Sequence, residues 1–267
     1  MMFVTDLDKT FLRTDLSVSE FSKQVWNSFK YPITIATARS YKGSRGLLER
    51  LELKYPLILL DGAMIAKPDG EIIKINAIDK FLGDEIIYEV YKEFKDYPLI
   101  VGFNEIGDEK FLYPKDLNPY QKHLLQNYKN DSRVLNIEKL RALTYNLKMV
   151  YLGEKEFLEK VENFIEEKFC VETKLTEDAY GPYYFLTILD KEADKANGLK
   201  HLEEVVGIDK EKVVVFGDNL NDIGMFEWAG KSIAVKNALD EVKKRADIVL
   251  PYTNDEDAVA RYLSKVM

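Results

Sequence analysis

The sequence contains one cysteine and two histidines among its 267 residues. Cys170 cannot form an internal disulfide, and the alternating Val171, Thr173 and Leu175 that follow it predict a packed thiol in a strand. Two histidines are too few for a histidine-rich metal site and lie too far from any nucleophile motif to suggest a triad. Redox chemistry and histidine-based catalysis are therefore not expected.

Other absences narrow the range of partners. No two glycines have G-x-G spacing and no G-x-x-x-x-G-K-[ST] occurs, so the usual nucleotide cradles are absent. Acidic residues (46) outnumber basic ones (38), and the resulting net charge of -8 argues against nucleic acid as a partner. The first residues lack a basic region followed by a long apolar run, and no stretch reaches the ~18 apolar residues of a membrane span. We expect a cytoplasmic protein with no membrane or nucleic-acid partner, and the oligomeric state is not predicted.

Both ends of the chain alternate between short apolar strands and helices. Strands are predicted at 2–4, 33–37 and 57–60 near one end, and at 213–216 and 233–235 near the other. The run Val213–Phe216 is continuously apolar, which is typical of a strand buried on both faces. This alternation predicts an α/β fold with a parallel sheet.

The middle of the chain has a different pattern. Ile86, Ile87 and Val90 recur at helical spacing, whereas Tyr145, Leu147, Met149 and Tyr151 alternate with polar residues, as in a sheet with one face in water. We therefore predict an inserted α+β domain over 80–189, within an α/β core formed by 1–79 and 190–267.

Carboxylates follow the first strand of the core. Asp6 and Asp8 are two residues apart, so they project on the same side of the chain, close enough to repel. A divalent cation would relieve this repulsion, and Mg²⁺ prefers such oxygen ligands. Taken alone, D-x-D is better explained as a solvated turn.

A second group of acids follows the buried strand at 213–216. Gly217-Asp218-Asn219-Leu220-Asn221-Asp222 places acids and amides at a strand-to-helix turn. Gly217 permits a tight turn, and the free N–H groups at a helix start can bind an anion. A simple capped helix start is the alternative explanation. Two buried strands that both end in acids favour a shared site.

Together these segments resemble the four motifs of the haloacid dehalogenase superfamily. Asp6-Leu-Asp8-Lys-Thr10 resembles D-x-D-x-T, Thr37-Ala-Arg39-Ser40 the threonine motif, Lys195 the motif lysine, and Gly217 to Asp222 the G-D-x-x-N-D motif. The long insertion resembles the α+β cap of the Cof-type phosphatase branch. The resemblance covers the whole chain and implies a Rossmann-like core with an inserted cap.

The resemblance also implies roles for individual residues. Asp6 would be the nucleophile that becomes an aspartyl-phosphate, and Asp8 the general acid and base. Thr37 and Lys195 would hold the phosphoryl oxygens, Asn221 would orient these groups, and Thr10 would brace the loop. Mg²⁺ would be bound by Asp6, by Asp218 and by the backbone carbonyl of Asp8, with Asp222 nearby.

Some positions remain open. Lys9, Ala38 and Asp61 depart from the commoner family residues, and no function is assigned to them. Arg39 has two equal interpretations, contact with the substrate or pairing with a surface acid. The turn-rich loop 178–183 contains Tyr180 and is either a substrate-selecting loop or a plain hairpin turn.

The predicted function is hydrolysis of a small phosphorylated metabolite, such as a sugar phosphate, by a magnesium-dependent phosphatase. A sugar-phosphate mutase of the same superfamily is one alternative, because it uses the same two aspartates. A non-catalytic phosphate-binding regulatory protein is another, although it predicts erosion of motifs that are intact here. The sequence does not name the substrate.

Overall fold

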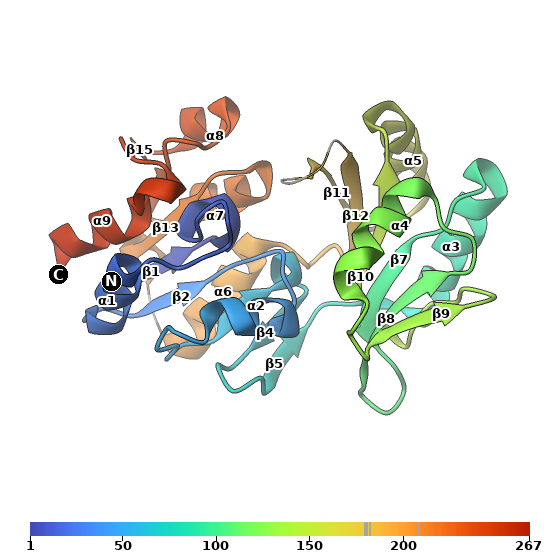
Figure 1. Cartoon of the computed structure of the whole chain (residues 1–267), viewed down its shortest axis with the longest axis horizontal. Helices are drawn as coiled ribbons and strands as arrows, with labels where there is room; N and C mark the ends of the chain where they lie inside the picture. Colours follow the sequence, from blue (N-terminus) through green and yellow to red (C-terminus); the bar gives the residue numbers. More distant parts are fainter. Residues whose placement is uncertain (179–180, 182, 208) are drawn as a thin grey trace. The chain divides into compact units, whose positions relative to one another are not determined.

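The computed structural model describes residues 1–178, 181, 183–207 and 209–267 (Figure 1). Its internal contacts divide the chain into two compact units, Met1–Ile75 with Asp194–Met267, and Asn76–Ala193. Below, the first is called the core unit and the second the cap unit. The predicted boundaries, at 79/80 and 189/190, lie within five residues of this division; that each unit is an independent domain stays a prediction. No helix of the described chain is both long and apolar enough to cross a membrane.

The core unit contains a five-stranded parallel sheet of order β15-β14-β13-β1-β2. Its strands are β1 (Met2–Thr5), β2 (Ile33–Ile35), β13 (Val213–Gly217), β14 (Lys231–Ala234) and β15 (Ile248–Val249). Every residue of β1 and β13 is buried, which explains why both are apolar runs without alternation. The α/β class predicted from the sequence is confirmed.

Helices connect and cover these strands. They are α1 (Glu20–Ser28), α2 (Tyr41–Leu48), α6 (Lys195–Val206), α7 (Ile223–Trp228), α8 (Asp240–Arg245) and α9 (Ala258–Val266). Helix α1 contacts α9, and α6 contacts α7. A small antiparallel sheet of β3 (Leu57–Leu59), β4 (Met64–Ala66) and β5 (Ile72–Ile75) follows, and a bridge from Ala36 to Ile58 attaches it beside β2.

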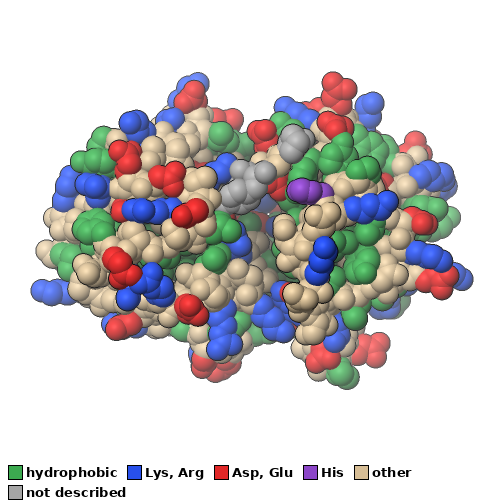
Figure 2. Space-filling model, viewed as in Figure 1, with side chains coloured by type: hydrophobic (Ala, Val, Ile, Leu, Met, Phe, Trp, Pro, Cys, Tyr) green, Lys and Arg blue, Asp and Glu red, His purple; other side chains and the backbone are tan. Residues whose placement is uncertain are grey.

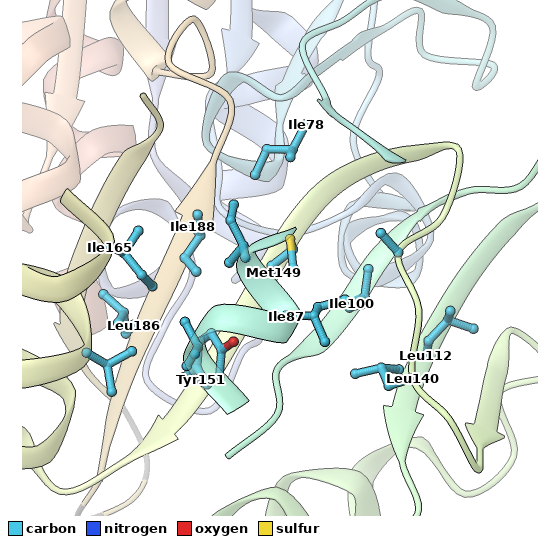
Figure 3. Close-up of a cluster of buried hydrophobic side chains, with 14 of the residues drawn as sticks. Ile78, Ile87, Ile100, Leu112, Leu140, Met149, Tyr151, Ile165, Leu186 and Ile188 are labelled. Carbon is cyan, nitrogen blue, oxygen red and sulfur yellow. The ribbon is translucent and has the colours of Figure 1, made fainter. Parts of the chain in front are cut away.

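The cap unit is built on a seven-stranded, mostly antiparallel sheet. Its strands are β6 (Ile78–Asp79), β7 (Leu99–Phe103), β8 (Glu109–Pro114), β9 (Val134–Ile137), β10 (Tyr145–Gly153), β11 (Glu172–Glu177) and β12 (Tyr184–Leu189). Its helices are α3 (Lys80–Phe94), α4 (Pro119–Leu125) and α5 (Lys155–Lys168). Figure 3 shows its main apolar cluster, in which Ile87 of α3 and Met149 and Tyr151 of β10 gather with Leu186 of β12.

Two expectations for the cap unit are wrong. Strand β10 has no simple wet face: Val150 and Leu152 are buried in a second cluster that includes Leu124 and Leu125, at the end of α4. A bulge between Asn146 and Lys148 also breaks the alternation, so Tyr145 is exposed while Asn146 is buried. Cys170 is exposed rather than packed, because β11 begins two residues after it.

On the face shown in Figure 2, acidic and basic side chains are interspersed. In the loop 178–183, residues 179, 180 and 182 lie outside the described residues, so a role of this loop in substrate selection stays a prediction.

Candidate functional site

Two loops that follow adjacent strands form the base of the site. Asp6 follows β1 and Asp218 follows β13, and the two strands pair in parallel from Met2 with Val213 to Thr5 with Phe216. The backbone N–H of Asp6 donates to the Phe216 carbonyl at 3.0 Å, which continues the pairing to the end of the sheet. Because the carboxyl ends of parallel strands meet at one edge, Asp6 and Asp218 are brought together there.

Lys195 joins this pair to a third acid. It is the first residue of α6, its side chain is fully buried, and its Nζ lies 2.7 Å from Asp6 Oδ1 and 2.6 Å from Asp222 Oδ1. Asp194, the helix N-cap residue of α6, accepts hydrogen bonds from the N–H groups of Ala196 and Asn197, which fixes the start of the helix. The motif lysine is thereby directed between two carboxylates.

Asp222 is held from both sides. Its Oδ1 pairs with Lys195, while its Oδ2 accepts hydrogen bonds from the backbone N–H groups of Asp218 at 2.8 Å and Asn219 at 3.1 Å. A Cβ atom on Gly217 would lie 2.5 Å from Asp222 Oδ2, so this close approach requires glycine. Asp222 therefore orients Lys195 and the Asp218 loop, and both its oxygens are already engaged by protein groups.

Asp218 completes the acid cluster. Ligand atoms of Asp6, Asp218 and Asp222 all lie within 4.8 Å of one another, and all three residues are buried. Asp218 Oδ1 accepts a hydrogen bond from the Thr10 hydroxyl at 2.7 Å, so Thr10 links the two motif loops. Within the described residues, Asp218 has no ion-pair partner.

The cluster is short of positive charge. Burial, together with the charge of Asp222, raises the pKa of Asp218 to about 7. Burial also raises the pKa of Asp6, and the charges of Asp222, Asp218 and Asp8 raise it further. The attraction of Lys195 lowers this pKa but does not offset those effects. Burial by itself would lower the pKa of Lys195, but Asp222 and Asp6 raise it above its ordinary value, so the ammonium stays charged.

The donor set fits a divalent cation. Its atoms are carboxylate oxygens, which Mg²⁺ prefers, and an added cation would compensate the buried negative charge of Asp6 and Asp218. Asp222 is the poorest of the three as a direct ligand, because its oxygens accept from Lys195 and from backbone N–H groups. The fit supports a site based on Asp6 and Asp218.

Asp8 is directed to a different partner. Its carboxylate forms a two-pronged pair with Arg39, with Nε 2.7 Å from Oδ2 and Nη2 2.6 Å from Oδ1. Both side chains are only about a quarter exposed. Arg39 thus pairs with an acid of the proposed site rather than with a surface acid, and its contact with a substrate stays a prediction. A metal contact from Asp8 would come from its backbone carbonyl, as the resemblance implies.

Thr37 and Asn221 both contact Asp61, Thr37 through its carbonyl and Asn221 through its side-chain amide. Thr37 is fully buried just beyond β2, and its Oγ1 accepts a hydrogen bond from the Arg39 N–H at 3.2 Å. Asn221 donates from Nδ2 to Asp61 Oδ1 at 2.9 Å. Their contacts with a phosphoryl group therefore stay predictions.

Asp61 is a site residue that the sequence did not identify. It is buried, has a left-handed backbone (φ 56°), and its charge contributes to the raised pKa of Lys195. The next residue, Gly62, has φ 95°, and a Cβ there would lie 2.1 Å from the Asp194 carbonyl oxygen. The Asp-Gly pair directly after the strand at 57–60 was the available signal, since it marks a tight turn at another strand end.

The chain is similar to known proteins over nearly its whole length, both in sequence and in structure. The chain is 24% identical over 271 residues to 5-amino-6-(5-phospho-D-ribitylamino)uracil phosphatase YitU of Bacillus subtilis, covering 99% of this chain and 96% of the relative. The crystal structure of TM0651 from Thermotoga maritima matches with a TM-score of 0.78 and 26% identity, covering 100% of this chain and 97% of that one.

A third match supports the fold alone. The subclass IIB sugar phosphatase BT4131 superposes with a TM-score of 0.75 at 19% identity, covering 99% of this chain and 98% of that one.

The family model for haloacid dehalogenase-like hydrolases matches residues 3–263. The chain therefore belongs to the haloacid dehalogenase-like hydrolase family.

Proposed function

We propose that this protein is a magnesium-dependent phosphatase that hydrolyses small phosphate monoesters, sugar phosphates among them, through an aspartyl-phosphate on Asp6. One observation carries the proposal: a fully buried ammonium, Lys195, bridges Asp6 and Asp222 beside Asp218. Such an arrangement binds a dianionic group and a cation together, which is the requirement of phosphoryl transfer. The phosphatase names of the relatives agree with it.

In the first step, a carboxylate oxygen of Asp6 attacks phosphorus and the bond from phosphorus to the ester oxygen breaks. Asp8 gives its proton to that leaving oxygen. Lys195 and Thr37 hold the phosphoryl oxygens while negative charge redistributes over them. The products of this step are a free alcohol and phosphorylated Asp6.

In the second step, water attacks the same phosphorus and the bond to Asp6 breaks. Asp8, now ionised, accepts a proton from the water, and inorganic phosphate is released. Arg39 holds the Asp8 carboxylate through two hydrogen bonds, which fixes the orientation of this side chain. Bound Mg²⁺ would supply charge neutralisation for Asp6, Asp218 and the phosphoryl oxygens.

The test is phosphate release from a panel of phosphorylated sugars and other metabolites, with and without Mg²⁺. We expect release by the wild type that depends on Mg²⁺, and none by Asp6→Asn, whose amide cannot act as the nucleophile. Isomerised sugar phosphate without net phosphate release would favour a mutase instead. No reaction of any kind across the panel would favour a binding protein.

A further inference from the structure

The loop that carries the proposed acid and base contains a strained residue. Lys9 has φ 58° and ψ 7°, between Asp8, whose carboxylate pairs with Arg39, and Thr10, whose hydroxyl binds Asp218. A non-glycine residue in this left-handed region is disfavoured and persists only where its surroundings hold it. The conformation at Lys9 determines which way the residues on either side of it point.

Two side-chain hydrogen bonds to the backbone of this loop come from the carboxy-terminal part of the core unit. Asn237 donates from Nδ2 to the Lys9 carbonyl at 2.8 Å, and its Oδ1 accepts from the backbone N–H of Asn254 at 2.9 Å. Asn254 in turn donates from its own Nδ2 to the Leu12 carbonyl at 3.0 Å. Two linked asparagines thus bind the loop at its strained centre and at its end.

The same segment reaches the second motif loop. The backbone N–H of Leu239 donates to the Asp218 carbonyl at 2.9 Å, and that of Val235 to the Gly217 carbonyl at 3.3 Å. Residues 235–239 therefore contact both the Asp8 loop and the Asp218 loop. Among the described residues, Asn237 supplies the only side-chain hydrogen bond from this segment to the backbone of residues 7–12.

We propose that Asn237 is a positioning residue for proton transfer: by holding the Lys9 carbonyl, it keeps the left-handed turn in place and Asp8 aimed at the leaving oxygen. This inference rests on the proposed phosphatase reaction. Asn237 is exposed, so removing its amide deletes two hydrogen bonds without opening a buried cavity. The defect should then appear in proton transfer rather than in folding.

The leaving group provides a selective readout. p-Nitrophenolate departs without a proton, whereas an alkoxide leaves poorly unless an acid protonates it. The ratio kcat/KM reports every step up to formation of the aspartyl-phosphate, including departure of the leaving group. A misplaced Asp8 therefore slows an alkyl phosphate more than p-nitrophenyl phosphate, while damage to the nucleophile or the cation site slows both equally.

The experiment compares kcat/KM of the wild type, Asn237→Ala and Asn27→Ala on p-nitrophenyl phosphate and on an alkyl phosphate, at saturating Mg²⁺. Asn27 is a matched control because its amide also donates to a carbonyl (Arg50, 3.2 Å) while its oxygen accepts a backbone N–H (Glu52, 2.9 Å). For Asn237→Ala we expect a loss of about tenfold or more on the alkyl ester and less than about threefold on the aryl ester. Asn27→Ala should leave the ratio of the two rates unchanged.

A second variant tests the role of strain. Glycine adopts φ 58° readily, so adding Lys9→Gly to Asn237→Ala should restore the wild-type ratio even if the loss of the lysine charge lowers both rates. Equal losses on both esters for Asn237→Ala, or failure of Lys9→Gly to restore the ratio of the two rates, would overturn the positioning role of Asn237 but not the proposed function. A wild type that hydrolyses neither ester would overturn the proposed function and this inference together.

Discussion

Replacing Lys195 by methionine tests the electrostatics of the site most sharply. The substitution keeps an unbranched side chain, one atom shorter, but removes the charge that bridges Asp6 and Asp222, at 2.7 and 2.6 Å. Removing one partner from a buried ion pair costs about 3–5 kcal/mol, because the other charge is left uncompensated. In metal-free buffer at pH 7, we expect the free energy of unfolding of the core unit to fall by about that amount.

Urea titration followed by tryptophan fluorescence measures this change. The chain has two tryptophans, Trp26 and Trp228, and both lie in the core unit, so the signal reports that unit. Adding Mg²⁺ at one hundred times its dissociation constant should stabilise either protein by about 2.7 kcal/mol, if the cation binds only the folded state.

Lys200→Met is the matched control. Lys200 lies on the same helix, α6, but its side chain is exposed and binds only Asn197 at 2.9 Å within the described chain. This change should alter the free energy of unfolding by less than about 0.5 kcal/mol. A loss for Lys195→Met that matches the control would refute the view that a buried ammonium balances this cluster.

Two further predictions concern the cap unit, and both can be measured by native-state hydrogen exchange of the amides in β7 and β10. Burial raises the pKa of Asp96 to about 6. The Asp96 carboxyl therefore binds its proton more tightly in the folded cap unit than in the unfolded chain. As the pH falls from 7 to 5, the free energy of unfolding of the cap unit should rise by about 1.4 kcal/mol, and Asp96→Asn should lack this rise. Equal pH dependence of the two proteins would disprove the prediction. Tyr151 is fully buried in the cluster of Figure 3, and its hydroxyl has no hydrogen-bond partner among the described residues, so Tyr151→Phe should stabilise the cap by about 1 kcal/mol. A loss of protection in that variant would show that the hydroxyl is satisfied.

The sequence predicted the parts of the site that follow from sheet geometry. Asp6 and Asp218 each come directly after a continuous apolar run, and parallel strands bring their carboxyl ends to one edge. Lys195 was placed by its motif rather than by any physical pattern, and a lysine at a helix start would not by itself have indicated a fully buried side chain. The structure brings Asp6, Asp218, Asp222 and Lys195 into one cluster; their roles in catalysis stay predictions.

The contacts that were not predicted depend on three-dimensional detail. Arg39 and Asp8 are 31 residues apart, and only the backbone path after β2 decides that they meet. Asp61 accepts a hydrogen bond from Asn221 because two left-handed residues, Leu60 and Asp61, turn the chain toward it. The exposure of Cys170 follows from where β11 begins, which alternation in the sequence cannot fix to within two residues.

The central claim is that Asp6 and Asp218 share one divalent cation beside a phosphoryl group. A crystal structure with Mg²⁺ and beryllium fluoride, which mimics a phosphoryl group on a carboxylate, tests it directly. We predict beryllium bonded to Asp6 and one Mg²⁺ at about 2.0–2.1 Å from oxygens of both Asp6 and Asp218. A cation bound elsewhere, or beryllium fluoride attached to a residue other than Asp6, would contradict the account.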